Sequence, residues 1–287
     1  MDFRDQANLD ASQVEERSGG RSRIPGGGLA VGGGITGIIA LIAALVFGIN
    51  PGNITGNDPE GIQPTTNLSE ECRTGADADQ SEKCRVVGVV NSIQEYWDGL
   101  DDYYYQQAKT VLFAQATNTG CGAADSSVGP FYCPRDQQVY LDLSFFDLLQ
   151  SRFGAEGGPF AQAYVIAHEY GHHVQYLAGQ LGRIGQDRQG ADSGSVKLEL
   201  QADCYAGVWA KHAVETGFYE RPFTRSDIQQ ALDAAAAVGD DRIQERTQGM
   251  IDPEAFTHGT ARQRVTWFTT GYETGSPDQC NTFRKGI

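Results

Sequence analysis

Basic residues are scarce in this sequence. Its 287 residues include 22 Lys and Arg against 37 Asp and Glu, which gives a formal net charge of −15. Binding to a phosphate backbone requires a basic surface, so this composition argues against a nucleic-acid partner. The chain also lacks a C-x-x-C pair, which argues against a metal site built from thiolates. Histidine is rare as well, yet three of the five histidines lie between His168 and His173.

The N-terminal part of the chain lacks the pattern of a soluble domain. Residues 1–28 are polar and glycine-rich, without apolar periodicity, and predict a disordered tail. No charged residue occurs between Ile24 and Asn57, and residues 29–49 are mostly apolar. At ~1.5 Å per residue, a helix of that length spans roughly 30 Å, the thickness of a bilayer core. Residues 29–49 therefore predict a transmembrane helix, with a cleaved signal peptide or a glycine-rich buried helix as alternatives.

Basic residues flank this apolar segment on one side only. Arg17, Arg21 and Arg23 precede it, and the next Lys or Arg is Arg73. The positive-inside rule then predicts a single-pass protein of the cell membrane, with a cytoplasmic N-terminus and an extracytoplasmic domain. All six cysteines follow residue 70, in the part that would be exported and where disulfides persist.

The remainder of the chain divides into a lead-in and one domain. Residues 50–84 are rich in Gly, Pro, Asn and Thr and predict a linker, whereas residues 85–287 have the composition of a folded domain. Apolar spacing and turn residues predict more helix than strand, which is an α+β fold with a small sheet. The expected helices are 86–100, 145–153, 159–177, 196–216, one from a capping box at 226–229 to about residue 239, and 261–271; the expected strands are 110–114 and 139–142.

The strongest chemical motif is H-E-x-x-H. His168, Glu169 and His172 form it within a segment of helical apolar spacing. Positions i and i+4 share one face of a helix, so both imidazoles can bind one metal ion. Glu169 would then lie beside the open coordination position. The alternative is a pair of structural histidines on a partly buried helix.

A catalytic zinc site needs a further protein ligand. A third histidine at the metzincin spacing is missing, and His212 and His258 have no ligand spacing. Glu199 is the better candidate. Asp203 lies four residues later, on the same face of the next predicted helix, and would accept the N–H of a ligand histidine. The exchanged assignment, with Asp203 as the ligand, and a pair of solvated acids remain open.

These residues also carry a family resemblance. The segments HEYGHHVQ, LELQADCYAGVWA, GPFYCPRDQQVYLDLSFF and FTHGTARQRVTWFTTGY resemble the bacterial neutral zinc metallopeptidases, a gluzincin-like, membrane-anchored family. The resemblance covers roughly residues 85–284 and does not include the tail before residue 29. It implies a zincin-like fold with Zn²⁺ bound by His168, His172 and Glu199, and with Glu169 as the catalytic residue.

The reaction that follows is peptide hydrolysis. A zinc ion held by these residues would supply Lewis acidity for activating water and polarising the carbonyl, and Glu169 is expected to take the proton from that water. A second donor commonly stabilises the oxyanion. His258 is the first candidate, with a structural histidine as the alternative, and Tyr170 is a weaker one. His173 is turned ~100° away from His172 by helix geometry and is expected to be a supporting or surface residue.

The six cysteines allow many pairings. Proximity along the chain favours Cys121–Cys133. Cys204, next to Asp203, would then join Cys280 near the C-terminus, which leaves Cys72–Cys84. Each bridge would stabilise the fold by roughly 2–4 kcal/mol.

The leading interpretation is a membrane-anchored zinc peptidase that acts on peptide or protein substrates. An alternative of another class is a catalytically silent zinc-binding interaction or assembly protein of the cell envelope. A zinc hydrolase of a non-peptide bond is a third. The intact set of His168, Glu169, His172 and Glu199 favours retained turnover.

Overall fold

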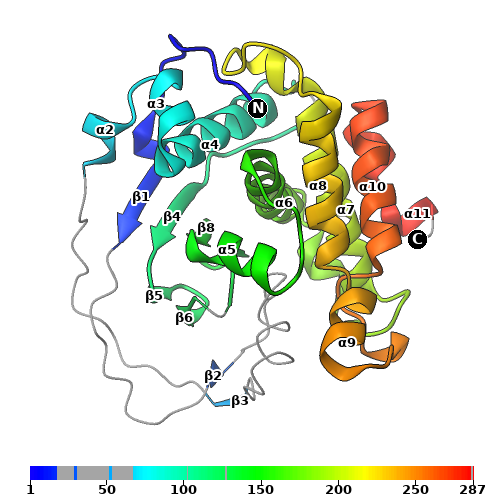
Figure 1. The fold of residues 1–287 in the computed structure, drawn as a ribbon. Helices are drawn as coiled ribbons and strands as arrows, with labels where there is room; N and C mark the ends of the chain where they lie inside the picture. The colour runs from blue at the N-terminus through cyan, green and yellow to red at the C-terminus, as the bar shows by residue number, and fades with distance from the viewer. Residues whose placement is uncertain (18–28, 31–51, 54–66, 102, 127, 286) are drawn as a thin grey trace.

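A computed structural model describes residues 1–17, 29–30, 52–53, 67–101, 103–126, 128–285 and 287. The fold is α+β, mostly helical with a small mixed sheet. Helix α6 lies at the centre, with the sheet, α4 and α5 on one side and α7, α8 and α10 on the other (Figure 1). The helices are α2 (Leu68–Glu71), α3 (Gly75–Gln80), α4 (Glu82–Asp98), α5 (Ser144–Ser151), α6 (Pro159–Leu177), α7 (Gly194–His212), α8 (Arg225–Ala237), α9 (Asp240–Gln248), α10 (Ala261–Thr274) and α11 (Thr282–Lys285), with short 3-10 turns η1 (Ala11–Gln13), η2 (Leu181–Ile184), η3 (Ala213–Thr216), η4 (Pro253–Ala255) and η5 (Pro277–Cys280). The strands are β1 (Val14–Arg17), β2 (Leu29–Ala30), β3 (Gly52–Asn53), β4 (Lys109–Phe113), β5 (Ala116–Thr119), β6 (Gly122–Asp125), β7 (Phe131–Cys133) and β8 (Gln138–Asp142).

Four strands form the main sheet in the order β1-β4-β8-β7. β1 and β8 run parallel to β4, and β7 runs antiparallel to β8. Successive side chains point to opposite faces. Leu112 and Leu141 therefore join the main core with α4 and α6, while Val111 and Tyr140 join a smaller apolar cluster on the other face. Ala124 of the β5–β6 hairpin belongs to that second cluster. β7 ends the strand order and therefore lies at an edge of the sheet.

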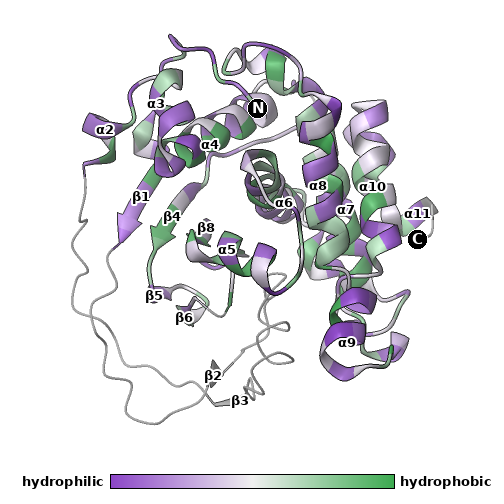
Figure 2. Cartoon of the chain, in the orientation of Figure 1, coloured by the Kyte–Doolittle hydropathy of each residue, from purple (hydrophilic) through white to green (hydrophobic). Residues whose placement is uncertain are grey.

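The long elements lie where the sequence predicts them, and the short ones were missed. Helix α6 has the predicted bounds, and β4 and β8 differ from prediction by one residue at their ends. The capping box of α8 is made by Thr224 and Asp227, not by the predicted box that begins at Ser226. Strands β5 to β7 were not expected because three or four residues carry little periodicity. Helix α9 was missed because it is hydrophilic along most of its length (Figure 2).

The predicted disorder of residues 1–28 is wrong for residues 1–17. Phe3, Leu9 and Val14 are buried in the main core, and β1 extends the sheet. The Phe3 ring packs on Tyr219 with ring centroids 4.7 Å apart. Residues 1–17 are held by contacts with other helices and strands. Such contacts do not require a periodic apolar pattern within the segment, so its order was not visible in the sequence. Residues 18–28 lie outside the described residues.

Residues 1–17 are joined to the rest of the domain by backbone hydrogen bonds. β1 pairs with β4, and the N–H of Arg4 donates to the carbonyl of Phe218. The predicted topology, with a cytoplasmic N-terminus and an extracytoplasmic domain, stays a prediction.

The predicted transmembrane helix falls almost entirely on residues that the structure does not describe. Its residues 31–49 lie outside the described residues, and Leu29–Ala30 pair antiparallel with Gly52–Asn53 as strands β2 and β3. In the part of the chain that the structure describes, no helix has both the length and the apolar character needed to cross a bilayer.

The folded domain also begins before the predicted boundary at residue 85. Helices α2 and α3 and the first turn of α4 lie within the expected linker 50–84, and Leu68, Cys72 and Ala78 are buried. Helix α3 begins with a capping box in which Thr74 accepts from the N–H of Asp77. Residues 54–66 of the linker lie outside the described residues.

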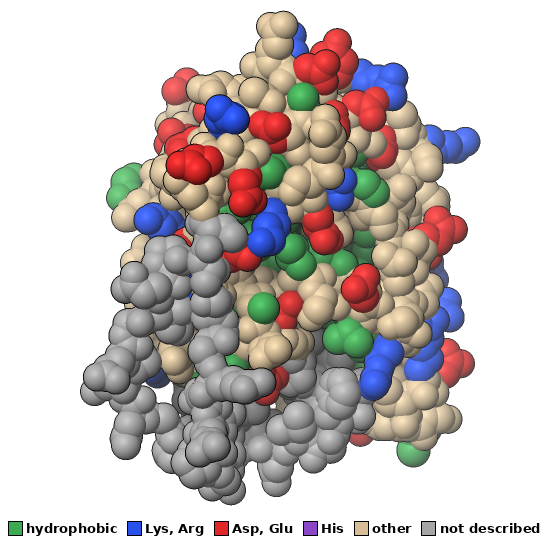
Figure 3. Space-filling view, turned by 60° about the vertical axis from the view of Figure 1, so that its left-hand side comes forward, with side chains coloured by type: hydrophobic (Ala, Val, Ile, Leu, Met, Phe, Trp, Pro, Cys, Tyr) green, Lys and Arg blue, Asp and Glu red, His purple; other side chains and the backbone are tan. Residues whose placement is uncertain are grey.

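All six cysteines are paired. The disulfides are Cys72–Cys84, Cys121–Cys133 and Cys204–Cys280, the pairing favoured by sequence proximity. The second tethers the β5–β6 hairpin to β7, and the third joins α7 to η5. On the face shown in Figure 3, acidic and basic side chains are interspersed around smaller apolar areas.

Candidate metal centre

The H-E-x-x-H motif lies on a helix that is buried along most of its length. Helix α6 begins with Pro159 at its first position, where the missing N–H costs no hydrogen bond. His168 and His172 share one face, with ring centroids 4.8 Å apart. A Cβ on Gly171 would lie 3.0 Å from the Cα of Ala202, so this glycine lets α7 approach α6 closely. The approach of α7 brings the second half of the site to the histidines.

Glu199 on α7 faces both histidines. Its Oε2 lies 3.2 Å from Nε2 of His168, and its Oε1 lies 3.4 Å from Nε2 of His172. One ligand atom from each of these three buried residues can be chosen so that all lie within 4.8 Å of one another. The structure thus brings together the three residues that the sequence proposed as metal ligands.

Unpartnered polar atoms show that this group fits a metal ion. Among the described residues, Nε2 of His172 and both carboxylate oxygens of Glu169 are buried without a hydrogen-bond partner of normal geometry. Buried polar atoms of this kind are rare and call for a ligand or water. Two imidazole nitrogens and a carboxylate oxygen, with a fourth position free, form the donor set of a catalytic zinc site. The residues present therefore fit zinc.

Asp203 binds the opposite side of the His168 ring. Its Oδ1 lies 2.8 Å from Nδ1 of His168, whereas Glu199 faces Nε2. Protonation at Nδ1 leaves the lone pair of Nε2 directed at the metal position. This geometry favours Glu199 as the ligand and Asp203 as the residue that orients His168, over the exchanged assignment.

Asp203 is itself held by residues that sequence analysis missed. Arg264 of α10 donates from Nε and Nη2 to the two carboxylate oxygens, each at 2.8 Å, and the Tyr164 hydroxyl donates at 2.6 Å. Arg264 reaches this buried position because Gly271 lets α10 approach α7; a Cβ there would lie 1.9 Å from the carbonyl oxygen of Cys204. Nothing local in the sequence marks an arginine in a capping-box helix as a partner of Asp203.

The charges of the site shift the pKa values of its groups. Burial alone would raise the pKa of Asp203, but the positive charge of Arg264 and the hydrogen bonds from Arg264 and His168 outweigh it and bring the pKa to about 2. Burial raises the pKa of Glu169 to about 6 despite the nearby histidines. Burial would lower the pKa of His172, yet the carboxylates of Glu199 and Glu169 raise it to about 9. With this pKa, the His172 ring is protonated at neutral pH when no metal is bound.

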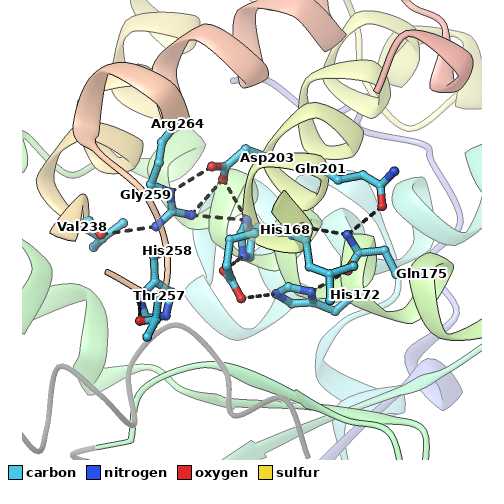
Figure 4. Close-up of polar contacts among 12 residues, drawn as sticks. His168, His172, Gln175, Gln201, Asp203, Val238, Thr257, His258, Gly259 and Arg264 are labelled. Atoms are coloured by element: carbon cyan, nitrogen blue, oxygen red, sulfur yellow. Dashed lines mark hydrogen bonds and ion pairs between the residues drawn. The ribbon is translucent and has the colours of Figure 1, made fainter. Parts of the chain in front are cut away.

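His258 lies on the loop before α10, at one side of the same site (Figure 4). Its Nδ1 lies 3.1 Å from Oδ1 of Asp240, and the N–H groups of Thr257, His258 and Gly259 donate to the other carboxylate oxygen. Asp240 raises the pKa of His258 against the effect of burial, and His258 is close enough to Glu199 for their charges to interact. Asp240 was not foreseen, because it begins the hydrophilic helix α9.

Two neighbouring residues of α6, His173 and Tyr170, contact other parts of the fold and do not face the metal position. His173 is buried, its Nε2 donates to the carbonyl of Gln106 at 2.6 Å, and the Tyr132 hydroxyl donates to its Nδ1 at 3.0 Å. His173 therefore ties α6 to β7. The hydroxyl of Tyr170 lies 3.0 Å from that of Thr110, against the sheet, so Tyr170 is not positioned as an oxyanion donor.

The sequence model of a family described as "Putative neutral zinc metallopeptidase" matches residues 1–283. The chain belongs to this family. The match begins at residue 1, so the family likeness extends further toward the N-terminus than the expected 85–284. This agrees with the docking of residues 1–17 onto the metallopeptidase domain.

Curated relatives of this metallopeptidase carry no assigned activity in their names. The uncharacterized protein Rv2575 of Mycobacterium tuberculosis is 51% identical over 250 residues, which cover 84% of this chain and 85% of the relative. The uncharacterized protein YpfJ of Escherichia coli K12 is 41% identical over 292 residues, covering 98% of this chain and 99% of YpfJ. No solved structure matches the chain.

Zinc affinity of this protein is expected to rise with pH. Zinc binds neutral imidazole, so below pH 9 it must displace the proton that Glu199 and Glu169 hold on His172, whose pKa is about 9. Loss of one proton on binding predicts a gain of about tenfold in affinity per pH unit. Competition with a chromophoric chelator between about pH 6.5 and 8.5 measures this slope. A pH-independent affinity would contradict the charged state of His172.

Proposed function

We propose that this protein is a zinc-dependent peptidase in which His168, His172 and Glu199 hold the metal and Glu169 acts as general base. The observation that carries the proposal is the buried carboxylate of Glu169, which has no hydrogen bond of normal geometry among the described residues and lies next to that three-residue group. A bound zinc ion would supply Lewis acidity for activating water and polarising a carbonyl. Family membership supports the same reading.

Glu169 has the properties of a base that works near neutral pH. With a pKa of about 6 it is ionised at pH 7, yet its conjugate acid is strong enough to return the proton to a leaving amine. The helix position beside His168 keeps its carboxylate out of the ligand set and directed at the same space. This is the arrangement that H-E-x-x-H hydrolases require.

The edge strand β7 supports a peptide as substrate. In the described sheet, β7 pairs only with β8, so its other edge can accept an extended chain by strand addition. The backbone N–H of Tyr132 in this strand helps to lower the pKa of Glu169, which indicates that β7 runs beside the base. The Tyr132 side chain is fixed to α6 through His173. A peptide added along β7 would thus lie next to Glu169.

His258 is the proposed donor to the oxyanion. Asp240 holds Nδ1 and favours the protonated ring, so Nε2–H is left to donate. A positively charged donor beside the site stabilises the negative charge that develops on the carbonyl oxygen. The alternative of a purely structural His258 predicts no effect of His258→Gln on turnover once the protein is folded.

The test is metal content and hydrolysis by the full chain purified in detergent. We expect about one zinc per chain and cleavage of unfolded casein or a peptide library, with both lost in Glu199→Ala. Glu95→Ala, an exposed glutamate on α4, is the matched control and should retain both. Stoichiometric zinc without any cleavage would favour the catalytically silent binding protein, and cleavage of non-peptide esters alone would favour the third interpretation. Retained zinc in Glu199→Ala would contradict the ligand set.

We also propose attachment to a membrane through residues 29–49, with the whole domain, residues 1–17 included, outside the cytoplasm. The apolar character of residues 29–49 supports attachment to a membrane, and the three disulfides support a location outside the cytoplasm. The β1–β4 pairing supports one side for residues 1–17 and the domain. Ser12→Cys and Ser226→Cys, both at exposed positions, should react equally with a membrane-impermeant maleimide on intact cells. Labelling at Ser226→Cys alone would support a cytoplasmic N-terminus and would contradict the β1–β4 pairing.

A further inference from the structure

The two metal-facing histidines are oriented by different kinds of partner. His168 has a carboxylate, Asp203, on its Nδ1. The Nδ1 of His172 instead lies 2.9 Å from Oε1 of Gln175, one helical turn later on α6. Gln175 is buried, as are His172 and Gln201, and Figure 4 shows it beside both of them. An amide can either donate or accept, so by itself Gln175 does not decide which nitrogen of His172 carries the proton.

Two backbone carbonyls decide it. Gln175 Nε2 lies 2.7 Å from the carbonyl oxygen of Leu198, which can only accept, so the NH₂ group of Gln175 points there. Its Oε1 is therefore turned to His172, whose Nδ1 must carry the hydrogen. When the ring is neutral, as metal binding requires, Nε2 of His172 is the nitrogen left with a lone pair, and it faces Glu199 and the metal position.

The second carbonyl acts through Gln201 on α7. Gln201 Nε2 donates to the carbonyl oxygen of Cys280 at 3.0 Å, so its Oε1 faces inward and accepts the second hydrogen of the Gln175 NH₂ group at 3.1 Å. We call Gln175 and Gln201 the amide pair. In this chain of hydrogen bonds, each of their donors and acceptors can point in only one direction. The direction is set at the outer end by the Cys280 carbonyl.

That outer end is held by a disulfide. Cys280 is bonded to Cys204, and both residues are fully buried. Cys204 directly follows Asp203 on α7, so the same bridge adjoins the residue that orients His168. The bridge closes a loop with a sequence separation of 76, so removing it would free η5 and the Cys280 carbonyl from α7.

We propose that Gln175 and Gln201 are positioning residues for the metal ligand His172, and that the Cys204–Cys280 disulfide anchors them, so that loss of the bridge weakens metal binding. The proposal rests on metal binding by the His168, His172 and Glu199 group. It assigns the amide pair a role in metal affinity and assigns the disulfide a role beyond global stability.

The test measures zinc affinity by chelator competition in the full chain. Gln175→Met removes the acceptor of His172 and should lower affinity about 10- to 100-fold, the usual effect of losing a partner of a ligand histidine. Gln201→Met and the Cys204→Ala/Cys280→Ala pair act one step further out and should lower affinity by about 3- to 10-fold. Methionine has nearly the volume of glutamine, so the metal-free fold should persist, as far-UV circular dichroism and thermal melting would report.

Two controls separate positioning from general weakening. Gln229→Met is the same change at an exposed position of α8, and Cys121→Ala/Cys133→Ala removes a bridge that does not touch the amide pair; neither should change zinc affinity. In the Gln175→Met background, Gln201→Met should cost nothing further, because the connection to His172 is already broken.

The outcomes are distinguishable. Wild-type affinity in Gln175→Met or Gln201→Met, or additive losses in the double variant, would overturn the proposal while leaving the proposed peptidase function intact. Equal losses in the two disulfide variants would overturn the anchoring role of Cys204–Cys280. A wild-type chain that binds no zinc would overturn the proposed function, and this inference with it.

Discussion

Glu169→Gln is expected to lower peptide hydrolysis by about 10³-fold while leaving zinc bound, since a positioned general base contributes about 10²–10⁴-fold. Glutamine has the shape of glutamate but cannot accept a proton from water. Glu169 is not one of the three metal-facing residues, so zinc affinity should stay within a few-fold of wild type. Turnover is measured with a quenched fluorescent peptide, and bound zinc by elemental analysis of the same sample.

The matched control is Glu95→Gln, the same change at an exposed position of α4. It should keep both turnover and zinc. If Glu169→Gln retains turnover within about tenfold of wild type, a contribution of the size expected of a general base is absent and the assigned role is wrong. If zinc were lost together with turnover, Glu169 would be a metal ligand. That result would contradict the proposed ligand set of His168, His172 and Glu199.

The largest expected effect on stability comes from Arg264→Met. This change leaves the carboxylate of Asp203 buried without its bidentate partner, and breaking a buried ion pair in this way costs about 3–5 kcal/mol. For a domain of this size, that predicts a drop in melting temperature of roughly 6–20 °C. The melt is recorded with a chelator present, so that lost zinc does not contribute to the difference.

Arg262→Met serves as the control, because Arg262 is exposed on the same helix two residues earlier. Its melting temperature should remain within about 2 °C of wild type. Adding Asp203→Asn to Arg264→Met removes the uncompensated charge and should recover part of the loss. A melting temperature of Arg264→Met equal to that of Arg262→Met would show that Arg264 does not stabilise the buried carboxylate.

The metal-facing residues were accessible to sequence analysis because helix geometry is local. His168 and His172 must share a face once the segment is helical, and a following helix with Glu199 and Asp203 presents both acids on one face. What the sequence left open was which acid binds the metal. The close approach of α7 to α6 at Gly171 decides it, because it directs Glu199 to Nε2 and Asp203 to Nδ1 of His168.

The residues that support the site were not accessible in this way. Arg264 and Asp240 meet their partners over separations of 61 and 18 residues, and no periodicity records such contacts. The amide pair is similar: Gln175 lies one turn after His172, but its direction depends on the carbonyls of Leu198 and Cys280. Long-range hydrogen bonds of buried polar groups are properties of the packed chain.

The sequence by itself determined the H-E-x-x-H helix, the acidic pair that follows it and the principal helices, since each depends on local spacing along the chain. Only the tertiary structure decided that residues 1–17 belong to the domain, because their place depends on pairing with β4 and on burial of Phe3 against Tyr219. The same long-range packing brings Glu199 to Nε2 and Asp203 to Nδ1 of His168, a choice between two acids that helix spacing left open.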